Sequence, residues 1–298
     1  MTSRLALYRL FRLRRLIGVA SGVPTLLLLF FALFAGWEAL LLLPLTIGLP
    51  LAHALRYPNE WVETILLSAL LVAGIYLTGV IGVFLGPVGK AVLVLLVVAI
   101  AVGLFIWLSE RVPDWLDQGV EEPLMVTARA RSRRPLAELR DKIVLTPGRR
   151  DARVTCHQPD DDGLFKVTYH FETPTVGGFA LMTNPVSFKV RQEVDEPECH
   201  EVRVVGETGN DVSALRTSFA KTWRGTAITM EEIAEPMTKA NAVGFWLMDG
   251  LADYLTDELD RAEGRPPRAN RFLPRDSLSA EMARWFDARM GRGATPAE

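Results

Sequence analysis

Residues 186–194 read Val-Ser-Phe-Lys-Val-Arg-Gln-Glu-Val, a strict alternation of apolar and polar side chains over most of its length. Successive side chains of an extended strand point to opposite faces of a sheet. One face of this stretch would therefore carry Val186, Phe188, Val190 and Val194, and the other Ser187, Lys189, Arg191 and Glu193. The pattern predicts a half-buried strand of an antiparallel sheet.

The same alternation continues on both sides of this stretch. It predicts inward-facing Leu124, Val126, Ala128 and Ala130 in a first strand, and Phe165, Val167, Tyr169 and Phe171 in a later one. Further strand candidates are residues 152–157, 199–206, 212–219 and 223–233. Segments rich in Gly, Pro, Asp and Asn at 159–163, 195–197 and 206–211 are typical reverse turns. We therefore expect an antiparallel meander, with residues 173–184 departing from a clean strand pattern.

Two helices accompany the predicted sheet. Residues 134–144 predict a short helix, with Pro135 near its start and Leu136, Leu139 and Ile143 at helical spacing. Pro236 opens a long helix to about Glu263, whose apolar stripe contains Phe245, Met248, Ala252, Leu255 and Leu259. The carboxylates Asp249, Asp253, Asp257 and Asp260 follow the other side of that helix. We expect this acidic row to face solvent.

The order of strand, short helix, meander and long C-terminal helix resembles the helix-grip superfamily of START-like and polyketide-cyclase-like (SRPBCC) domains. The resemblance covers residues 123–263. Two local features are similar to patterns of the family: the opening VTARARSRRPLAELRDKI of residues 126–143, and Trp223-Arg224-Gly225-Thr226. The resemblance implies an α+β domain in which an antiparallel sheet grips the long helix around an apolar cavity.

Relatives in this superfamily hold lipids, sterols, polyketides and other hydrophobic molecules, so the resemblance implies a similar ligand here. The residues that we expect to line the cavity are Phe165, Tyr169, Phe179, Phe188, His200, Trp223, Phe245 and Met248. The sequence leaves open whether these side chains surround a cavity or fill a solid core.

The first third of the chain has a different character. Long runs without charge predict about four membrane spans, at residues 17–35, 37–55, 64–86 and 91–109, because about 20 apolar residues cross a bilayer as a helix. The second span is interrupted by Glu38, Pro44, Pro50 and His53, so it is either a kinked span or a re-entrant partner of the first. The runs predict an integral membrane protein.

Basic residues orient these spans. Arg4, Arg9, Arg12, Arg14 and Arg15 precede the first span, Arg56 lies in the second connection and Arg111 follows the last. Because cationic loops are retained in the cytoplasm, four spans place both termini there, most simply at a bacterial inner (plasma) membrane. We thus divide the chain into a membrane region (1–111), a linker (112–122), the helix-grip domain (123–263) and a tail (264–298).

The tail contains a predicted amphipathic helix at residues 276–290. Arginines at both ends of the chain could contact an anionic bilayer surface. The membrane-surface candidates are Arg12, Arg14, Arg15, Trp285 and Arg289. A solvated tail is the equally weighted alternative.

The sequence contains few candidates for catalytic or metal-binding residues. The pairs Cys156-His157 and Cys199-His200 contain zinc-type ligands, but adjacent strand residues face opposite ways, with Cys156 and His200 inward. We expect neither a metal site nor a cofactor. A net charge of −2 gives no indication of nucleic-acid binding.

These observations predict a membrane-anchored domain that binds a lipid-like molecule and has no catalytic residues. Two alternatives stay open. One is a cyclase- or aromatase-like enzyme of the same fold, and the other is a membrane scaffold with a filled core. The oligomeric state is not indicated by the sequence.

Overall fold

The computed structural model describes residues 3–35, 41–58, 60–82, 84–117, 122–151, 153–170, 175–176, 179–180, 186–206, 209–237, 239–266 and 268. The chain forms two compact units. The first comprises Met1–Arg12 and Arg111–Leu273, and the second comprises Leu13–Glu110 and Pro274–Glu298. The N-terminal helix α1 (Ser3–Arg12) thus groups with the C-terminal domain.

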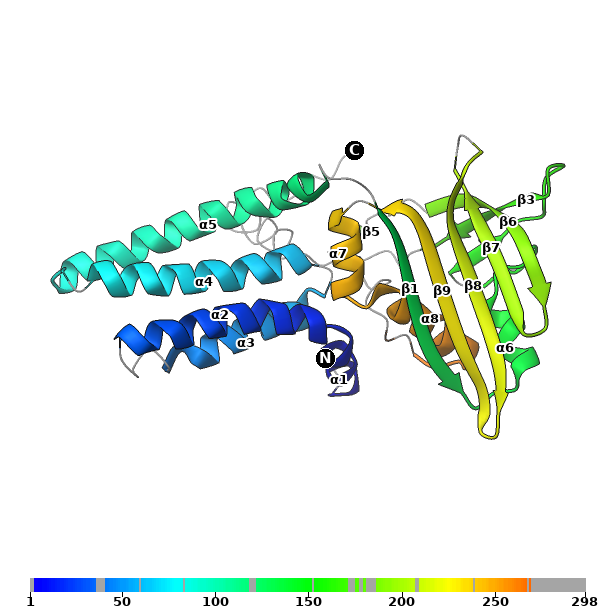
Figure 1. Cartoon of the computed structure of the whole chain (residues 1–298), viewed down its shortest axis with the longest axis horizontal. Coiled ribbons are helices and arrows are strands. Elements are labelled where there is room, and N and C mark those ends of the chain that lie inside the picture. The colour runs from blue at the N-terminus through cyan, green and yellow to red at the C-terminus, as the bar shows by residue number, and fades with distance from the viewer. Residues whose placement is uncertain are drawn as a thin grey trace. The chain divides into compact units, whose positions relative to one another are not determined.

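The first unit is built on a seven-stranded antiparallel sheet of order β1-β9-β8-β7-β6-β3-β2 (Figure 1). Its strands are β1 (Glu122–Ser132), β2 (Val154–Cys156), β3 (Leu164–Tyr169), β6 (Val186–Glu196), β7 (Cys199–Val205), β8 (Asp211–Thr222) and β9 (Gly225–Met237). Four consecutive strands, β6 to β9, form the predicted meander. The antiparallel sheet predicted from the alternation and the α+β architecture implied by the resemblance are confirmed.

One face of this sheet carries the apolar core. Ala128, Phe165, Val167 and Val190 are buried in a common apolar core, as the alternation predicted, and Phe188 packs against it. Leu124, Phe171 and Val186 lie outside the side chains that the structure describes. The alternating residues Lys166, Lys189 and Arg191 are exposed on the other face.

The short helix α6 (Leu136–Ile143) forms where the sequence predicted it. Pro135 precedes its first turn, and Leu139 and Ile143 are buried in the core. Proline suits this boundary because its ring fixes φ near the helical value and because the first residues of a helix need no backbone N–H donor.

The predicted long helix from Pro236 to Glu263 is wrong. Pro236 lies inside β9, and the remainder forms two helices, α7 (Lys239–Leu247) and α8 (Gly250–Ala262). Asp249 separates them with a left-handed backbone (φ 53°), a conformation that aspartate tolerates better than most residues. A Cβ atom on Gly250 would lie 2.6 Å from the Phe245 ring, so only glycine lets the two helices meet this closely.

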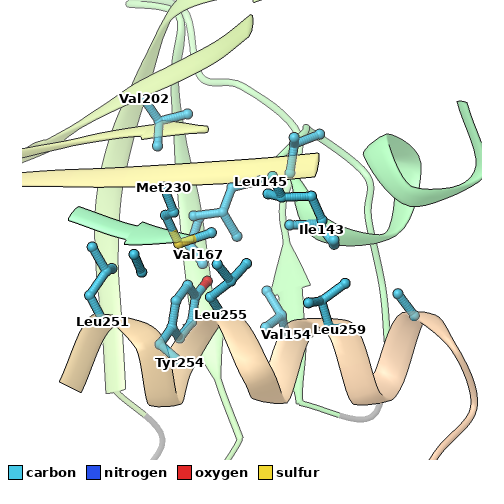
Figure 2. Close-up of a cluster of buried hydrophobic side chains, with 14 of the residues drawn as sticks. Ile143, Leu145, Val154, Val167, Val202, Met230, Leu251, Tyr254, Leu255 and Leu259 are labelled. Atoms are coloured by element: carbon cyan, nitrogen blue, oxygen red, sulfur yellow. The ribbon is translucent and has the colours of Figure 1, made fainter. Parts of the chain in front are cut away.

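Helix α8 lies on the apolar face of the sheet (Figure 2). Leu251, Tyr254, Leu255 and Leu259 point from the helix toward Met230, Val167 and Val154 of the strands in Figure 2. The sheet and α8 therefore enclose one shared core, which is the arrangement expected of a helix-grip domain.

The irregular stretch of residues 173–184 is described only at residues 175–176 and 179–180. Its described residues form a separate two-stranded pair, β4 (Thr175–Val176) with β5 (Phe179–Ala180). Strand β3 pairs directly with β6, so no strand from this stretch enters between them. The described residues of the stretch are therefore not part of the main sheet.

The second unit contains α2 (Arg14–Ala35), α3 (Leu43–Arg56), α4 (Trp61–Gly82) and most of α5 (Pro87–Asp117). Two described stretches, Trp61–Gly79 and Pro87–Ser109, are long and apolar enough to cross a membrane, or three if the bent pair α1–α2 counts as one span. Four spans are not supported. The 14 residues of α3 rise only about 21 Å, short of a hydrocarbon core of about 30 Å.

Polar side chains join the helices of this unit. His53 of α3 bonds the Thr64 hydroxyl of α4 through Nδ1 at 2.9 Å, and its Nε2 lies 3.3 Å from the Glu60 carboxylate. The Ser68 hydroxyl donates to the Ala20 carbonyl of α2. The ionisable His53 and Glu60 are therefore paired with each other within this unit.

Candidate functional site

Every residue of α8 from Leu251 to Asp260 is buried, although half of the helix surface is polar. The apolar side of the helix faces the sheet. The acidic side requires other partners, because a buried carboxylate without compensation is very unfavourable.

Helix α1 covers the beginning of the acidic side. The Tyr8 hydroxyl donates to the Asp253 carboxylate at 2.6 Å, and the Arg12 guanidinium donates to Asp249 at 3.0 Å and to the Thr256 hydroxyl at 2.8 Å. Arg268, beyond the helix, donates to both oxygens of Asp260. The prediction that this acidic row faces solvent is wrong, because side chains distant in sequence cover it.

Arginines cover the end of the acidic side. Glu258 is fully buried, and its carboxylate accepts from Arg149 at 2.9 Å and from Arg261. Both arginines also bind Asp151, at 2.6 Å and 2.7 Å. Arg149, Arg261, Asp151 and Glu258 thus form a closed ring of ion pairs, which we call the arginine network.

Asp257 lies beside this network. Its Oδ2 accepts from Arg261 at 3.1 Å and lies 3.9 Å from Arg153. Its Oδ1 is buried without a hydrogen-bond partner in the described part of the chain. Burial raises the pKa of Asp257 to about 6, and Arg153 and Arg261 counteract only part of that effect.

Two buried phenols meet where α8 approaches β3. The hydroxyls of Tyr169 and Tyr254 are 2.8 Å apart, and the Tyr169 ring stacks on Phe188 with centroids 5.6 Å apart. Burial raises the pKa of Tyr254 well above its ordinary value. The structure therefore brings together the predicted cavity residues Phe165, Tyr169, Phe188 and Phe245, all packed in or against the core.

The other predicted cavity residues are dispersed. His200 is buried, with Nε2 3.2 Å from the Leu145 carbonyl and Nδ1 3.3 Å from Asp195. Trp223 is 84% exposed in the β8–β9 turn, under the guanidinium of Arg224, and does not line the space beside α8. Met248 is partly buried at the α7–α8 break. The Phe179 side chain lies outside those described.

Cys156 and His200 are both buried, as the alternation predicted. Burial raises the pKa of the Cys156 thiol to about 11 and lowers the pKa of His200. A protonated thiol is a poor nucleophile. In the described ranges, no group of three or more His, Cys, Asp and Glu side chains could hold a metal ion.

Of the predicted membrane-surface residues, Arg12 is bound to α8, as described above. Arg14 is exposed and Arg15 partly buried at the start of α2. Trp285 and Arg289, with the whole predicted helix 276–290, lie outside the described residues.

A groove of about 800 Å³ crosses one end of strands β3, β6 and β7. Its apolar lining comes from Leu164, Phe188, Val204, Val205 and Val212, and its polar lining from Lys166, Ser187 and Lys189. Gly206 and Gly209 border it in the β7–β8 connection. The volume lies within the range of about 300–1,000 Å³ typical of small-molecule sites.

Sequence reasoning missed the α1 contact, the arginine network and the lysines of the groove. Arg149, Arg153 and Asp151 lie close together in sequence just before β2, which was the one available signal for the network. Neither the α1 contact nor the groove has a local signature, because each joins segments that are distant in sequence.

No protein-family model matches the chain. No curated protein matches it either. Similar solved structures include the Polyketide_cyc-like protein Cgl2372 from Corynebacterium glutamicum, at 13% identity over 55% of this chain and 97% of that chain, with a TM-score of 0.27.

Two further structures are similar at the same level. The di-domain ARO/CYC protein BexL of the BE-7585A biosynthetic pathway has 14% identity over 62% of each chain and a TM-score of 0.33. Protein MLL2253 from Mesorhizobium loti has 12% identity over 47% of this chain and 97% of that chain, with a TM-score of 0.31. Similarities this weak carry no functional argument, and the fold assignment rests on the chain's own sheet order and on the helix that the sheet encloses.

Proposed function

We propose that this chain is a membrane-anchored helix-grip protein that binds a hydrophobic, lipid-like molecule on the cytoplasmic side of the membrane and does not catalyse a reaction. The groove carries this proposal, because it is a volume of ligand size with an apolar lining. Around α8, the predicted cavity residues Phe165 and Tyr169 are buried in the apolar core, and Phe188 and Phe245 pack against it. Binding is therefore assigned to the groove.

Membrane anchoring is supported by α4 and α5, whose apolar stretches have the length of a bilayer span. The α1 contact adds a constraint on topology. Because Tyr8 and Arg12 bind α8, the N-terminal helix and the domain lie on the same side of the membrane. The chain between them must then cross an even number of times.

Two crossings by α4 and α5, with α2 and α3 as a hairpin that enters and leaves on one side, satisfy this constraint. The arginines before α2 favour the cytoplasm for that side. An epitope at the N-terminus and one inserted in the exposed Trp223–Arg224 turn would then be cleaved together in inside-out vesicles. Protection of only one epitope would contradict this topology.

The packing of predicted cavity residues into or against the core beside α8 favours a second candidate, a membrane scaffold that binds no small molecule. The two candidates are separated by photo-crosslinking. The full chain, purified in nanodiscs, is labelled with a diazirine-bearing single-chain lipid analogue, and labelled peptides are mapped by mass spectrometry. Saturable labelling of the groove strands is expected for the binding protein.

A matched pair of variants sharpens the result. Val212→Trp fills the groove and should abolish saturable labelling, whereas Met125→Trp places the same side chain at an exposed position outside the groove lining. Labelling confined to α2–α5, or equal labelling of both variants, would favour the scaffold.

A further inference from the structure

Two lysines stand directly opposite each other beside the groove. Lys166 of β3 and Lys189 of β6 are register partners in the antiparallel pair, and both line the groove. Side chains in such positions are neighbours on the same face of the sheet, and like charges there repel. A nearby anion would compensate this repulsion.

The protein supplies that compensation only in part. The Lys189 ammonium lies 3.1 Å from the Asp160 carboxylate. Lys166 has no ion pair with any residue that the structure describes. The next basic residue along β6, Arg191, is balanced by Glu193 and Asp211. The excess positive charge is therefore concentrated at Lys166, at the groove.

The rest of the lining is apolar. Leu164 lies on β3, Val205 on β7 and Val212 on β8, and Val205 is buried although it alternates with the inward-facing Val204. A ligand that fits this lining has a hydrocarbon part for the valines and leucine and an acidic group for the lysines. The Ser187 hydroxyl, which is within 3.0 Å of Thr168, adds a polar contact on the same face.

We propose that the groove takes a single-chain amphiphile with an acidic head group, which Lys166 and Lys189 bind while the chain lies along the apolar lining. This inference rests on the proposed function and adds the class of ligand. Because the lysines are partly solvent-exposed, their contribution is selectivity for the acid rather than most of the affinity.

Paired photo-probes test the inference on the full chain in nanodiscs. The two probes share one diazirine-bearing hydrocarbon chain and differ only in ending with a carboxylate or an alcohol. The variant Lys166→Gln/Lys189→Gln should weaken saturable labelling by the carboxylate probe about fivefold and leave labelling by the alcohol probe unchanged. Comparing variants at one probe cancels the different partitioning of the probes into lipid.

Controls separate the possible failures. Lys221→Gln removes an exposed lysine that does not line the groove and should behave like the wild type. Excess butyrate, which has the acid without the chain, should not compete. Equal effects of the double variant on both probes, or none on either, would overturn the acidic-head inference while leaving binding intact. Absence of saturable labelling by both probes in the wild type would overturn the proposed function as well.

Discussion

Helices α5 and α8 have opposite relations between composition and burial. Helix α5 contains an almost uninterrupted apolar stretch, Pro87–Ser109, and none of that stretch is buried within the protein. Helix α8 carries four acidic residues over 13 positions, and every residue from Leu251 to Asp260 is buried. Composition alone would predict the opposite environment for each helix.

The difference shows that the composition of a helix surface predicts the chemistry of its surroundings and not whether it is buried. The exposed apolar surface of α5 matches lipid, which lies outside the chain. The acidic surface of α8 binds arginines and a tyrosine that the chain itself provides from α1, from the segment before β2 and from Arg268 after α8. Disrupting the ion pairs of α8 should lower the stability of the domain, and placing a charge on α5 should lower membrane insertion.

The largest expected effect is on the arginine network. Glu258→Ala should lower the free energy of unfolding of the domain by about 3–5 kcal/mol, because it removes the fully buried one of the two carboxylates that Arg149 and Arg261 share and leaves only the partly exposed Asp151. Urea denaturation of the detergent-solubilised full chain, followed by near-UV circular dichroism, measures this. Glu138→Ala, which removes an exposed partner of Arg134, should cost less than about 1 kcal/mol. Equal losses of unfolding free energy in the two variants would mean that the arginine network stabilises the domain no more than a surface ion pair does.

The second prediction concerns a charge introduced into the apolar stretch of α5. Leu96→Arg, in the middle of the exposed apolar stretch, should disfavour membrane insertion by about 2.5–3.5 kcal/mol. The fraction of chain resistant to alkaline extraction from membranes measures this, with Leu96→Ala as the matched control. Unchanged extraction of Leu96→Arg would show that α5 does not face lipid.

Much of the domain could be predicted before its structure was known, because strand alternation is a local property. The inward positions of Val167 and Val190 followed from their neighbours alone. The break at Asp249 was missed because helical spacing continues through it, although the Asp249-Gly250 pair was a usable signal. The environment of the acidic row was missed because Tyr8 and Asp253 are separated by 245 positions, and spacing within α8 cannot reveal a partner elsewhere in the chain.

A smaller effect should appear in the pH dependence of stability. Since the pKa of Asp257 is raised from 3.8 to about 6, the folded state binds more protons than the unfolded state between about pH 4 and 6. The contribution of Asp257 to stability is therefore greatest below pH 4 and declines as the pH rises through 6, by up to about 3 kcal/mol. Denaturation of wild type and Asp257→Asn at several pH values measures this.

The difference between the two proteins isolates Asp257, because both retain the other titrating groups, including Asp151, whose pKa is lowered and whose effect has the opposite sign. Asp257→Asn should gain stability relative to the wild type as the pH rises from 4 to 7. A difference that does not vary with pH would mean that Asp257 ionises normally despite its burial.

The smallest effect should come from the contact that brings α1 to α8. Tyr8→Phe keeps the ring and removes the hydroxyl that donates to Asp253 at 2.6 Å, so it should cost about 1–2 kcal/mol. Hydrogen–deuterium exchange of the full chain should then show faster exchange in α1 and the first turns of α8, and little change in β6 and β7. If exchange rises equally throughout the domain, α1 is an integral part of the core. If it rises in α1 and the start of α8 only, α1 is a separately stabilised cover, and the acidic side of α8 depends on this N-terminal helix for its burial.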